Sequence, residues 1–164
     1  MRTIVISLTL SILTTVAVAQ QPAAAALKTF TSSAEVAALA AKAKADRKEN
    51  QATVSLPILR LAPYNANLEY RASVGPAAVH EKEAEMFYVI DGSATLMTGG
   101  KLTSETRTNA ENLSGTGIEG GTSRAVAKGD FVIVPENTPH WFSAINGTIT
   151  LMSVHMPRPV PAGH

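Results

Sequence analysis

AVHEKEAEMFYVIDG, residues 78–92, is the stretch of sequence that says most about the fold of this chain. It places an imidazole at His80 and a carboxylate at Glu85, immediately before a run of mostly apolar residues. Alternate residues of a β-strand face the same side, so Glu85, Phe87 and Val89 are expected on one face. Because a carboxylate in an apolar row is costly to bury unless it is paired or binds a metal, Glu85 is a candidate metal ligand.

A second stretch, GDFVIVPENTPH at residues 129–140, places another imidazole directly after a strand and a proline-containing turn. His140 and Phe142 share a strand face in the segment that follows. Two histidines and one carboxylate that converge from two hairpins form a ligand set that suits Fe(II), and also Mn, Zn or Ni. We therefore expect His80, Glu85 and His140 to meet inside a β-barrel and to bind a divalent transition metal (Fe, Mn, Zn or Ni).

Together the two stretches resemble the paired motifs of the cupin superfamily, G-x5-H-x-H-x(3,4)-E-x6-G and G-x5-P-x-G-x2-H-x3-N. The second motif is matched by Gly129, Pro135 and His140, while Ala144 stands at its last position. Asn137 replaces the motif's internal glycine, and both residue types tolerate the left-handed backbone conformation.

The first motif is matched by Glu85 and Gly92 at the required spacing, with His80 at the second histidine. Ala78 then occupies the place of the first histidine. An alternative alignment puts His80 in the first place and Lys82 in the second, but its spacer is one residue short. The first alignment needs no deletion and is preferred.

The resemblance implies an all-β fold, a cupin-type jelly-roll double-stranded β-barrel over residues 51–157, often a homodimer. Members that keep three histidines and one glutamate usually bind Fe, Mn, Ni or Zn. We therefore predict a metal-dependent enzyme acting on a small organic substrate, with dioxygenase, lyase and isomerase chemistry all left open. The alternative is a metal-free barrel that binds a small ligand without catalysis.

Six further residues are candidates for the site. Phe87, Phe142 and Met152 are predicted to form the pocket wall, with ordinary core packing as the alternative. His155 is predicted to line the pocket as a fourth ligand or a base, or else to be a satisfied or surface histidine. Two candidates for the chemistry are Tyr70, as an acid or base, and Lys82, which can reach a substrate anion at the mouth.

Before the barrel, residues 20–50 are predicted to form an extension and one helix, over about 33–48. Ser32 and Glu35 have the spacing of a capping box, and apolar residues then recur at helical spacing. From residue 52 short β-branched runs alternate with turn residues, as in a sandwich or barrel. Strands are expected at 53–61, 67–73, 77–80, 85–91, 93–98, 123–127, 131–134, 140–145 and 148–156.

Three features of these strands and their connections are predicted from turn chemistry. Pro57 marks the first strand as an edge strand or a bulged one. Asp91-Gly92 and Asn146-Gly147 are read as hairpin turns. Residues 99–122 are polar and almost lack large apolar side chains, so we predict a mobile loop or a lid.

The chain ends carry their own signals. Residues 1–19 have an early Arg2, an apolar run and a small-x-small site at Ala17–Ala19, which predicts a signal peptide cleaved after Ala19. The expected location is therefore periplasmic or secreted, with no membrane attachment after cleavage. The other end, residues 158–164, is a proline-rich tail that carries His164.

The net charge and the lack of cysteine limit the kinds of partner and metal site that this chain can have. Arg2 is the only charge in the first nineteen residues, so removing them from 14 Lys+Arg and 13 Asp+Glu leaves 13 of each. A net charge of zero argues against nucleic acid and anionic membranes, and favours a small-molecule partner. With no cysteine in the chain, a tight metal site must use histidine and carboxylate.

Overall fold

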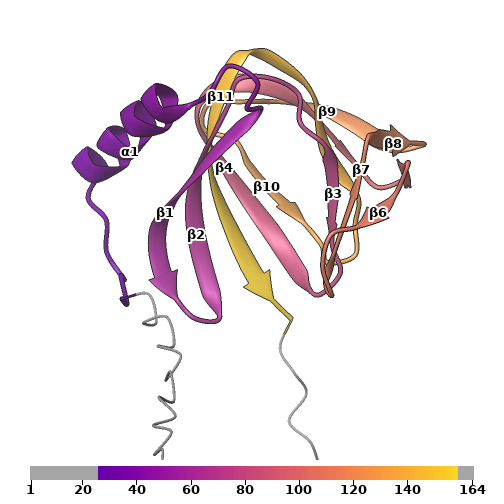
Figure 1. The fold of residues 1–164 in the computed structure, drawn as a ribbon, viewed down its shortest axis with the longest axis horizontal. Coiled ribbons are helices and arrows are strands. Elements are labelled where there is room, and N and C mark those ends of the chain that lie inside the picture. Colours follow the sequence, from indigo (N-terminus) through magenta and orange to yellow (C-terminus); the bar gives the residue numbers. More distant parts are fainter. Residues whose placement is uncertain (1–25, 159–164) are drawn as a thin grey trace, which may run out of the picture.

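In a computed structural model, residues 26–158 form one all-β barrel with one helix packed on its outer side (Figure 1). The predicted signal peptide, residues 20–25 and residues 159–164 lie outside the described residues. Within the part of the chain that the structure describes, no helix has both the length and the hydrophobicity needed to cross a membrane. The predicted fold class is confirmed.

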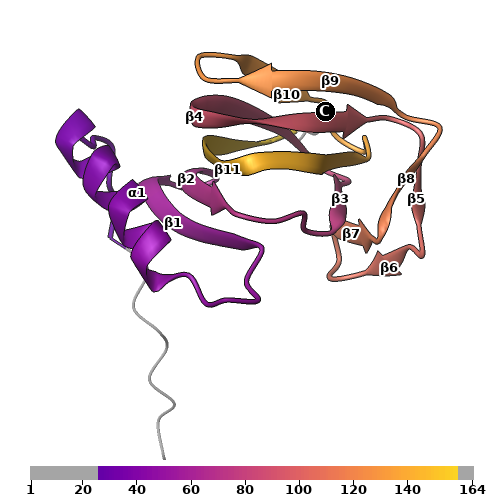
Figure 2. The ribbon, with the colours of Figure 1, turned by 90° about the horizontal axis from the view of Figure 1, so that it is seen from above.

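The helix α1 spans Ser33–Asp46 and begins at a capping box. The Ser32 hydroxyl accepts a hydrogen bond from the Glu35 backbone N–H at 3.2 Å, and the Glu35 carboxylate accepts one from the Ser32 N–H at 2.8 Å. The helix buries Ala43 completely and lies against two strands, β1 (Thr53–Leu61) and β2 (Tyr64–Arg71) (Figure 2). The thin alanine face therefore covers a sheet, as expected.

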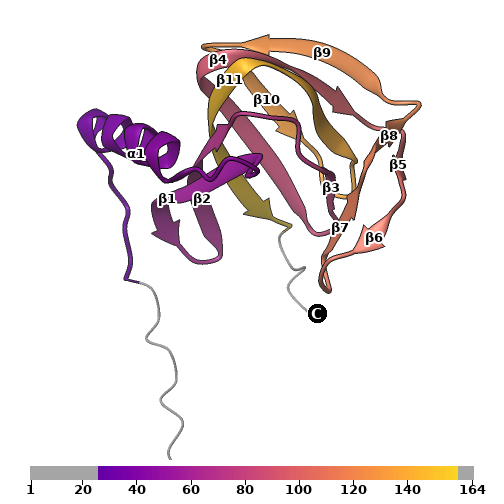
Figure 3. The same cartoon turned by 45° about the horizontal axis from the view of Figure 1, so that its top comes forward.

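Two long strands, β4 (Glu83–Thr98) and β11 (His140–Pro157), run side by side in the main sheet, to which every strand but β5 and β8 belongs (Figure 3). β11 pairs with β2, β3 and β4, and β4 also pairs with β9 and β10. The strands are β1 Thr53–Leu61, β2 Tyr64–Arg71, β3 Ala77–His80, β4 Glu83–Thr98, β5 Lys101–Thr103, β6 Thr106–Arg107, β7 Asn112–Gly115, β8 Gly117–Glu119, β9 Thr122–Ala127, β10 Phe131–Val134 and β11 His140–Pro157.

β1 lies at the edge of the main sheet, and its register with β2 shifts between Pro57 and Leu59. The prediction from Pro57 is confirmed on both counts, because the strand is at an edge and is bulged. Proline lacks an N–H and therefore fits only where a ladder hydrogen bond is absent.

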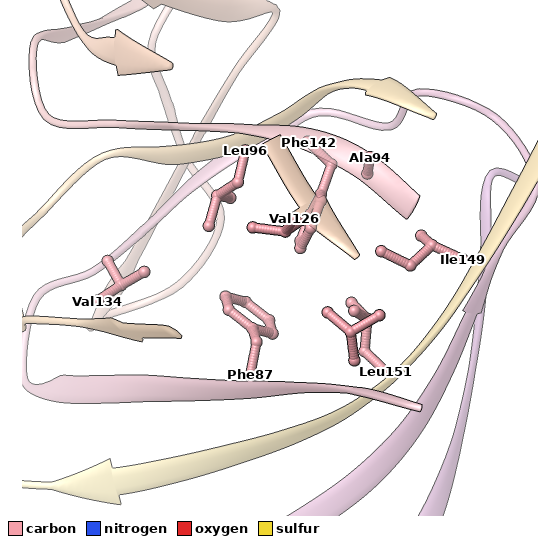
Figure 4. Close-up of a cluster of buried hydrophobic side chains, with 9 residues drawn as sticks. Phe87, Ala94, Leu96, Val126, Val134, Phe142, Ile149 and Leu151 are labelled. Carbon is pink, nitrogen blue, oxygen red and sulfur yellow. The ribbon is translucent and has the colours of Figure 1, made fainter. Parts of the chain in front are cut away.

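Residues on β2, β11 and the first half of β4 alternate between two faces with opposite environments. Odd-numbered residues such as Phe87, Val89 and Leu151 face the barrel interior, where they form a buried apolar cluster (Figure 4). Even-numbered residues such as Leu68 and Tyr70 pack in a second cluster with Ala43 of α1. The sheet thus separates an enclosed interior from a layer beneath the helix.

Two turn predictions are wrong. Asp91-Gly92 lies within the continuous strand β4, and Asn146-Gly147 lies within β11. Both glycines have positive φ, 83° at Gly92 and 73° at Gly147, but the chain bends there and does not reverse. The register between the two strands shifts between Ile145 and Ile149, so a bulge takes the place of a hairpin.

Residues 99–122 do not form the long structureless loop that was predicted. They contain β5 to β8, and β7 pairs with β3 from Ala77–Gly115 to His80–Asn112. The short polar strands bury few apolar side chains, so the alternation that marks a strand is absent from this part of the sequence. The segment extends the sheet beside His80.

Candidate metal centre

Glu85 is the centre of the candidate site. It is an inward residue of β4, directly opposite His155 of β11 in the antiparallel register. Its side chain is almost fully buried, and Ser153 donates a hydrogen bond to Glu85 Oε1 at 2.5 Å. A buried carboxylate held in this way needs positive or hydrogen-bonding partners on its remaining lone pairs.

Three imidazoles supply those partners. His80 Nε2 and His140 Nε2 lie 3.2 Å and 3.0 Å from Glu85 Oε2, and His155 Nε2 lies 3.4 Å from Oε1. The ligand atoms of His80, Glu85 and His155 all lie within 4.8 Å of one another. The ring centroids of His80 and His140 are 5.3 Å apart.

Each imidazole is held by its other nitrogen. His80 Nδ1 lies 2.6 Å from Asn112 Oδ1, His140 Nδ1 lies 3.2 Å from the carbonyl of Thr138, and His155 Nδ1 lies 3.0 Å from Glu83 Oε2. All three partners are acceptors, so Nδ1 carries the proton and Nε2 is the nitrogen turned toward Glu85. This is the arrangement by which outer hydrogen bonds orient histidine ligands around a metal.

Asn112 is itself oriented. Its amide nitrogen donates to Asn109 Oδ1 at 3.0 Å, which leaves its oxygen facing His80. β6, which pairs with the strand that carries Asn112, is tied to the turn after β3, because the Arg107 guanidinium pairs with Glu81 at 2.7 Å. The β6–β7 segment thus fixes one ligand from outside.

Charges within the cluster stabilise one another. Burial acts to raise the pKa of Glu85, but hydrogen bonds from His140 and His80 and the charges of His140 and His155 hold the pKa of this carboxyl well below its usual range. Burial acts to lower the pKa of His80, but hydrogen bonds to Glu85 and Asn112 raise it above its ordinary value. A divalent cation at the same point would compensate the buried carboxylate in the same way.

A pocket of about 340 Å³ opens beside this cluster. Small residues form part of its wall, including Ala78 at the place of the missing histidine. The pocket is lined by Ala52, Thr53, Glu69, Arg71, Pro76, Ala78, His80, Glu85, His140 and His155.

The structure brings the three predicted ligands together and adds His155 to them. His155 faces Glu85 across the strand pair, so it lies within the cluster of potential ligands. Phe87 and Phe142 lie in the interior cluster with ring centroids 5.3 Å apart, and Phe87 is 6.0 Å from the His140 ring. Neither ring is among the residues that line the pocket, so the structure places both in the core packing that was the alternative to a pocket wall.

Tyr70 and Met152 face the other way. Their even positions on β2 and β11 place both in the cluster beneath α1, with Tyr70 only 8% exposed. The inward direction predicted for these residues is wrong. Met152 and His155 cannot share one strand face, because they are an odd number of residues apart.

Lys82 is largely exposed and pairs with Glu111 at 3.2 Å, outside the residues that line the pocket. Sequence reasoning missed Asn112, Glu83 and Ser153, which orient the ligands, and Glu69 and Arg71, which line the pocket. Glu69 and Arg71 alternate along β2 on its inward face, so the pairing of β2 with its neighbours would have identified them. The sequence does not mark this face as inward, because its residues are polar.

Comparison with known proteins supports the fold. The family model for Cupin matches residues 44–157. No curated protein sequence matches this chain. A crystal structure of Fe(II) HppE aligns with a TM-score of 0.51 and 17% identity over 67% of this chain and 54% of HppE. This chain therefore spans about half the length of HppE.

Two smaller structures align over most of their own length. KdgF from Halomonas sp. has a TM-score of 0.49 and 16% identity, covering 69% of this chain and 87% of KdgF. A putative mannose-6-phosphate isomerase from Ralstonia eutropha JMP134 has a TM-score of 0.48 and 15% identity, covering 70% and 94%. Because the Cupin model matches well over half of the sequence, the chain belongs to the cupin family.

Proposed function

We propose that this protein is an exported cupin that binds one divalent transition metal and acts on a small organic substrate in the adjoining pocket. One observation carries the proposal. Three Nε2 atoms surround a single buried carboxylate, while every Nδ1 is occupied by an acceptor. Export rests on the pattern of residues 1–19 alone.

The donor set fits a transition metal. Imidazole nitrogen and carboxylate oxygen suit Zn, Fe, Mn and Ni, and neither sulfur nor a wholly oxygen set is present among the clustered side chains of the described residues. His80, Glu85 and His140 are the proposed ligands, with His155 as the fourth. His155 thus supplies from the last strand the imidazole that Ala78 lacks.

A bound divalent ion would supply Lewis-acid polarisation of a substrate oxygen or, for iron, oxygen chemistry. The protein's own residues have separate tasks. Ser153 and the Nδ1 partners fix the proposed ligands, and Phe87 of the apolar core lies next to the His140 ring. The pocket side of His80 and His155 remains half-buried, so a small substrate can reach it. Dioxygenase, lyase and isomerase reactions all remain open within this proposal.

Metal analysis tests it. Protein isolated without chelator is expected to carry about one equivalent of transition metal per chain, measured by plasma mass spectrometry. Glu85→Gln and His140→Ala are expected to lose most of it, whereas Tyr70→Phe, on the opposite face of the sheet, keeps it. Wild-type protein that neither carries nor takes up Fe, Mn, Zn or Ni would refute the proposal.

The same measurement separates the chemistries and the binding-only alternative. Fe(II) would point to oxygenation, and Zn or Mn to lyase or isomerase reactions. A small ligand that raises the melting temperature equally in metal-loaded and metal-free protein would favour a barrel that binds without catalysis.

A further inference from the structure

Arg71 and Glu69, two neighbouring inward residues of β2, line the same pocket as the candidate ligands. Arg71 Nη2 and Nε lie 2.6 Å and 3.0 Å from one oxygen of Glu69, Oε2. Their side chains are 17% and 13% exposed, so the pair is largely withdrawn from water. Removing two charged groups from water costs free energy that their attraction does not always offset. The position of this pair therefore suggests a role in binding rather than in stability.

The guanidinium is fixed in orientation. Its Cζ atom lies 4.6 Å from the centroid of the Phe142 ring, which is itself buried. Glu69 occupies Nε and one hydrogen of Nη2, and Nη1 has no hydrogen-bond partner among the described residues. The side chain is therefore held on two sides, with its outer edge left for a ligand.

Arginine binds carboxylates through just such an edge, with two parallel N–H donors in a plane. Among the residues that line this pocket in the described part of the chain, Arg71 is the one lysine or arginine. The pocket volume of about 340 Å³ lies at the small end of the range for ligand sites.

We infer that Arg71 binds the carboxylate of a small monoanionic substrate and turns the rest of the molecule toward His80 and His155. This inference rests on the proposed function and names its substrate class. It also moves the anion-binding role predicted for Lys82 to a side chain that lines the pocket.

Charge balance favours a monoanion over a dianion. Among the groups that line the pocket, the two positive charges of a divalent ion and the one of Arg71 face two carboxylates, Glu85 and Glu69, which leaves one positive charge at the pocket wall when the histidines are neutral. The nearby carboxylate of Glu83 lies behind His155, on its Nδ1, and does not line the pocket. A monocarboxylate neutralises it. A phosphate dianion adds a second negative charge close to Glu69, where like charges repel.

The test compares two probes of the same shape, 4-hydroxybutyrate and its uncharged amide, 4-hydroxybutyramide. NMR titrations of the full chain loaded with Zn(II) give the affinity of each. Wild type is expected to bind the acid at least roughly tenfold more tightly than the amide, as for a charged hydrogen-bonded pair. Arg71→Gln is expected to bind both equally, and Arg124→Gln, an exposed site on β9, to behave as wild type.

Two further variants keep the test decisive if Arg71→Gln fails to fold. Glu69→Gln/Arg71→Gln removes both charges together and is expected to lose the preference for the acid. Glu69→Gln alone is expected to gain binding of inorganic phosphate, because the repelling carboxylate is gone. Equal binding of acid and amide by wild type, or a preference that persists without Arg71, would overturn the inference.

The two proposals fail separately. If the protein takes up no Zn(II) but still prefers the acid through Arg71, the anion site stands and the metal centre falls. If Zn(II) binds stoichiometrically and the acid has no advantage, the metal centre stands and the anion site falls.

Discussion

The two faces of the sheet formed by β2, β11 and β4 carry opposite chemistry in the same three strands. The inward face holds Glu85, His155 and Arg71 around a pocket of about 340 Å³. The outward face holds Leu68, Tyr70 and Met152 beneath α1. One residue's shift in register would exchange the two sets.

A hollow larger than this pocket lies on the outward side. It measures about 720 Å³ and is lined mostly by apolar residues of α1, β1, β4 and β10, among them Val36, Ile90 and Phe131. None of the three clustered histidines lines it, nor does Glu85. The candidate site is thus distinguished by polar groups that converge from several strands, and not by the size of its hollow.

Adding metal is expected to produce the largest difference between variants of the two faces. A metal-free sample given Zn(II) at about a thousand times its dissociation constant should gain about 4 kcal/mol in free energy of unfolding. Chemical denaturation with and without Zn(II) measures this gain. Glu85→Gln should gain little, whereas Tyr70→Phe on the outward face should gain as much as wild type; an equal gain in all three would place the ion elsewhere.

Leu68→Ala tests the outward face alone. Leu68 is completely buried, and removing its side chain should lower the free energy of unfolding by roughly 2–5 kcal/mol. Leu68→Met, which keeps the volume, should cost less than about 1.5 kcal/mol. Denaturation and metal analysis are measured together, and loss of bound metal in folded Leu68→Ala would show that the two faces are coupled.

Strand parity also explains what the sequence could and could not predict. Alternation alone assigns Glu85, Phe87 and Val89 to the interior, and all three are buried there. Tyr70 and Met152 were misdirected, because parity states which residues share a face but not which face lies inside. Which face lies inside depends on where α1 packs, and this is set by the tertiary structure.

His155 shows the same limit at the site itself. Its place beside Glu85 depends on the β4–β11 register, and that register includes the bulge at residues 145–149. Turn chemistry predicts hairpins at Gly92 and Gly147, and both glycines do have positive φ. It could not show that the strands continue through them, because a positive φ permits a bend as readily as a reversal.

Asn112→Ala tests the hydrogen bond that holds His80 from outside the metal cluster. Loss of the acceptor on His80 Nδ1 should weaken metal binding by roughly 10- to 100-fold, as for other partners that orient ligands. Competition with a coloured chelator measures the affinity. Asn112→Asp keeps an acceptor and should retain more affinity than alanine, and Asn146→Ala, which is exposed on β11, should change nothing.

A smaller effect is expected from pH in the metal-free protein. The folded pKa of His80 is raised, so its stabilising contribution is complete below its unfolded value of 6.5 and is lost as pH rises through the folded pKa. The lowered pKa of Glu85 gives a contribution present above 4.5 that is lost only in stronger acid. Denaturation should therefore show greatest stability between these values.

Metal binding should follow the opposite trend and weaken as pH falls below about 6.5, because the ligating imidazoles must lose protons. Metal-free stability that rises with pH from 6 to 8 would contradict the proposed charge arrangement. Zn(II) affinity across the same range provides the matched measurement.

The smallest effect is expected at the start of α1, farthest in sequence from the histidines. Ser32→Ala removes the side-chain acceptor for the Glu35 N–H and should cost about 1 kcal/mol of stability. Ser32→Asp keeps an acceptor and should recover most of that loss. Because the helix covers only the outward face, Zn(II) affinity should be unchanged in both variants, and a drop in affinity would mean that the helix layer helps to position the ligands across the sheet.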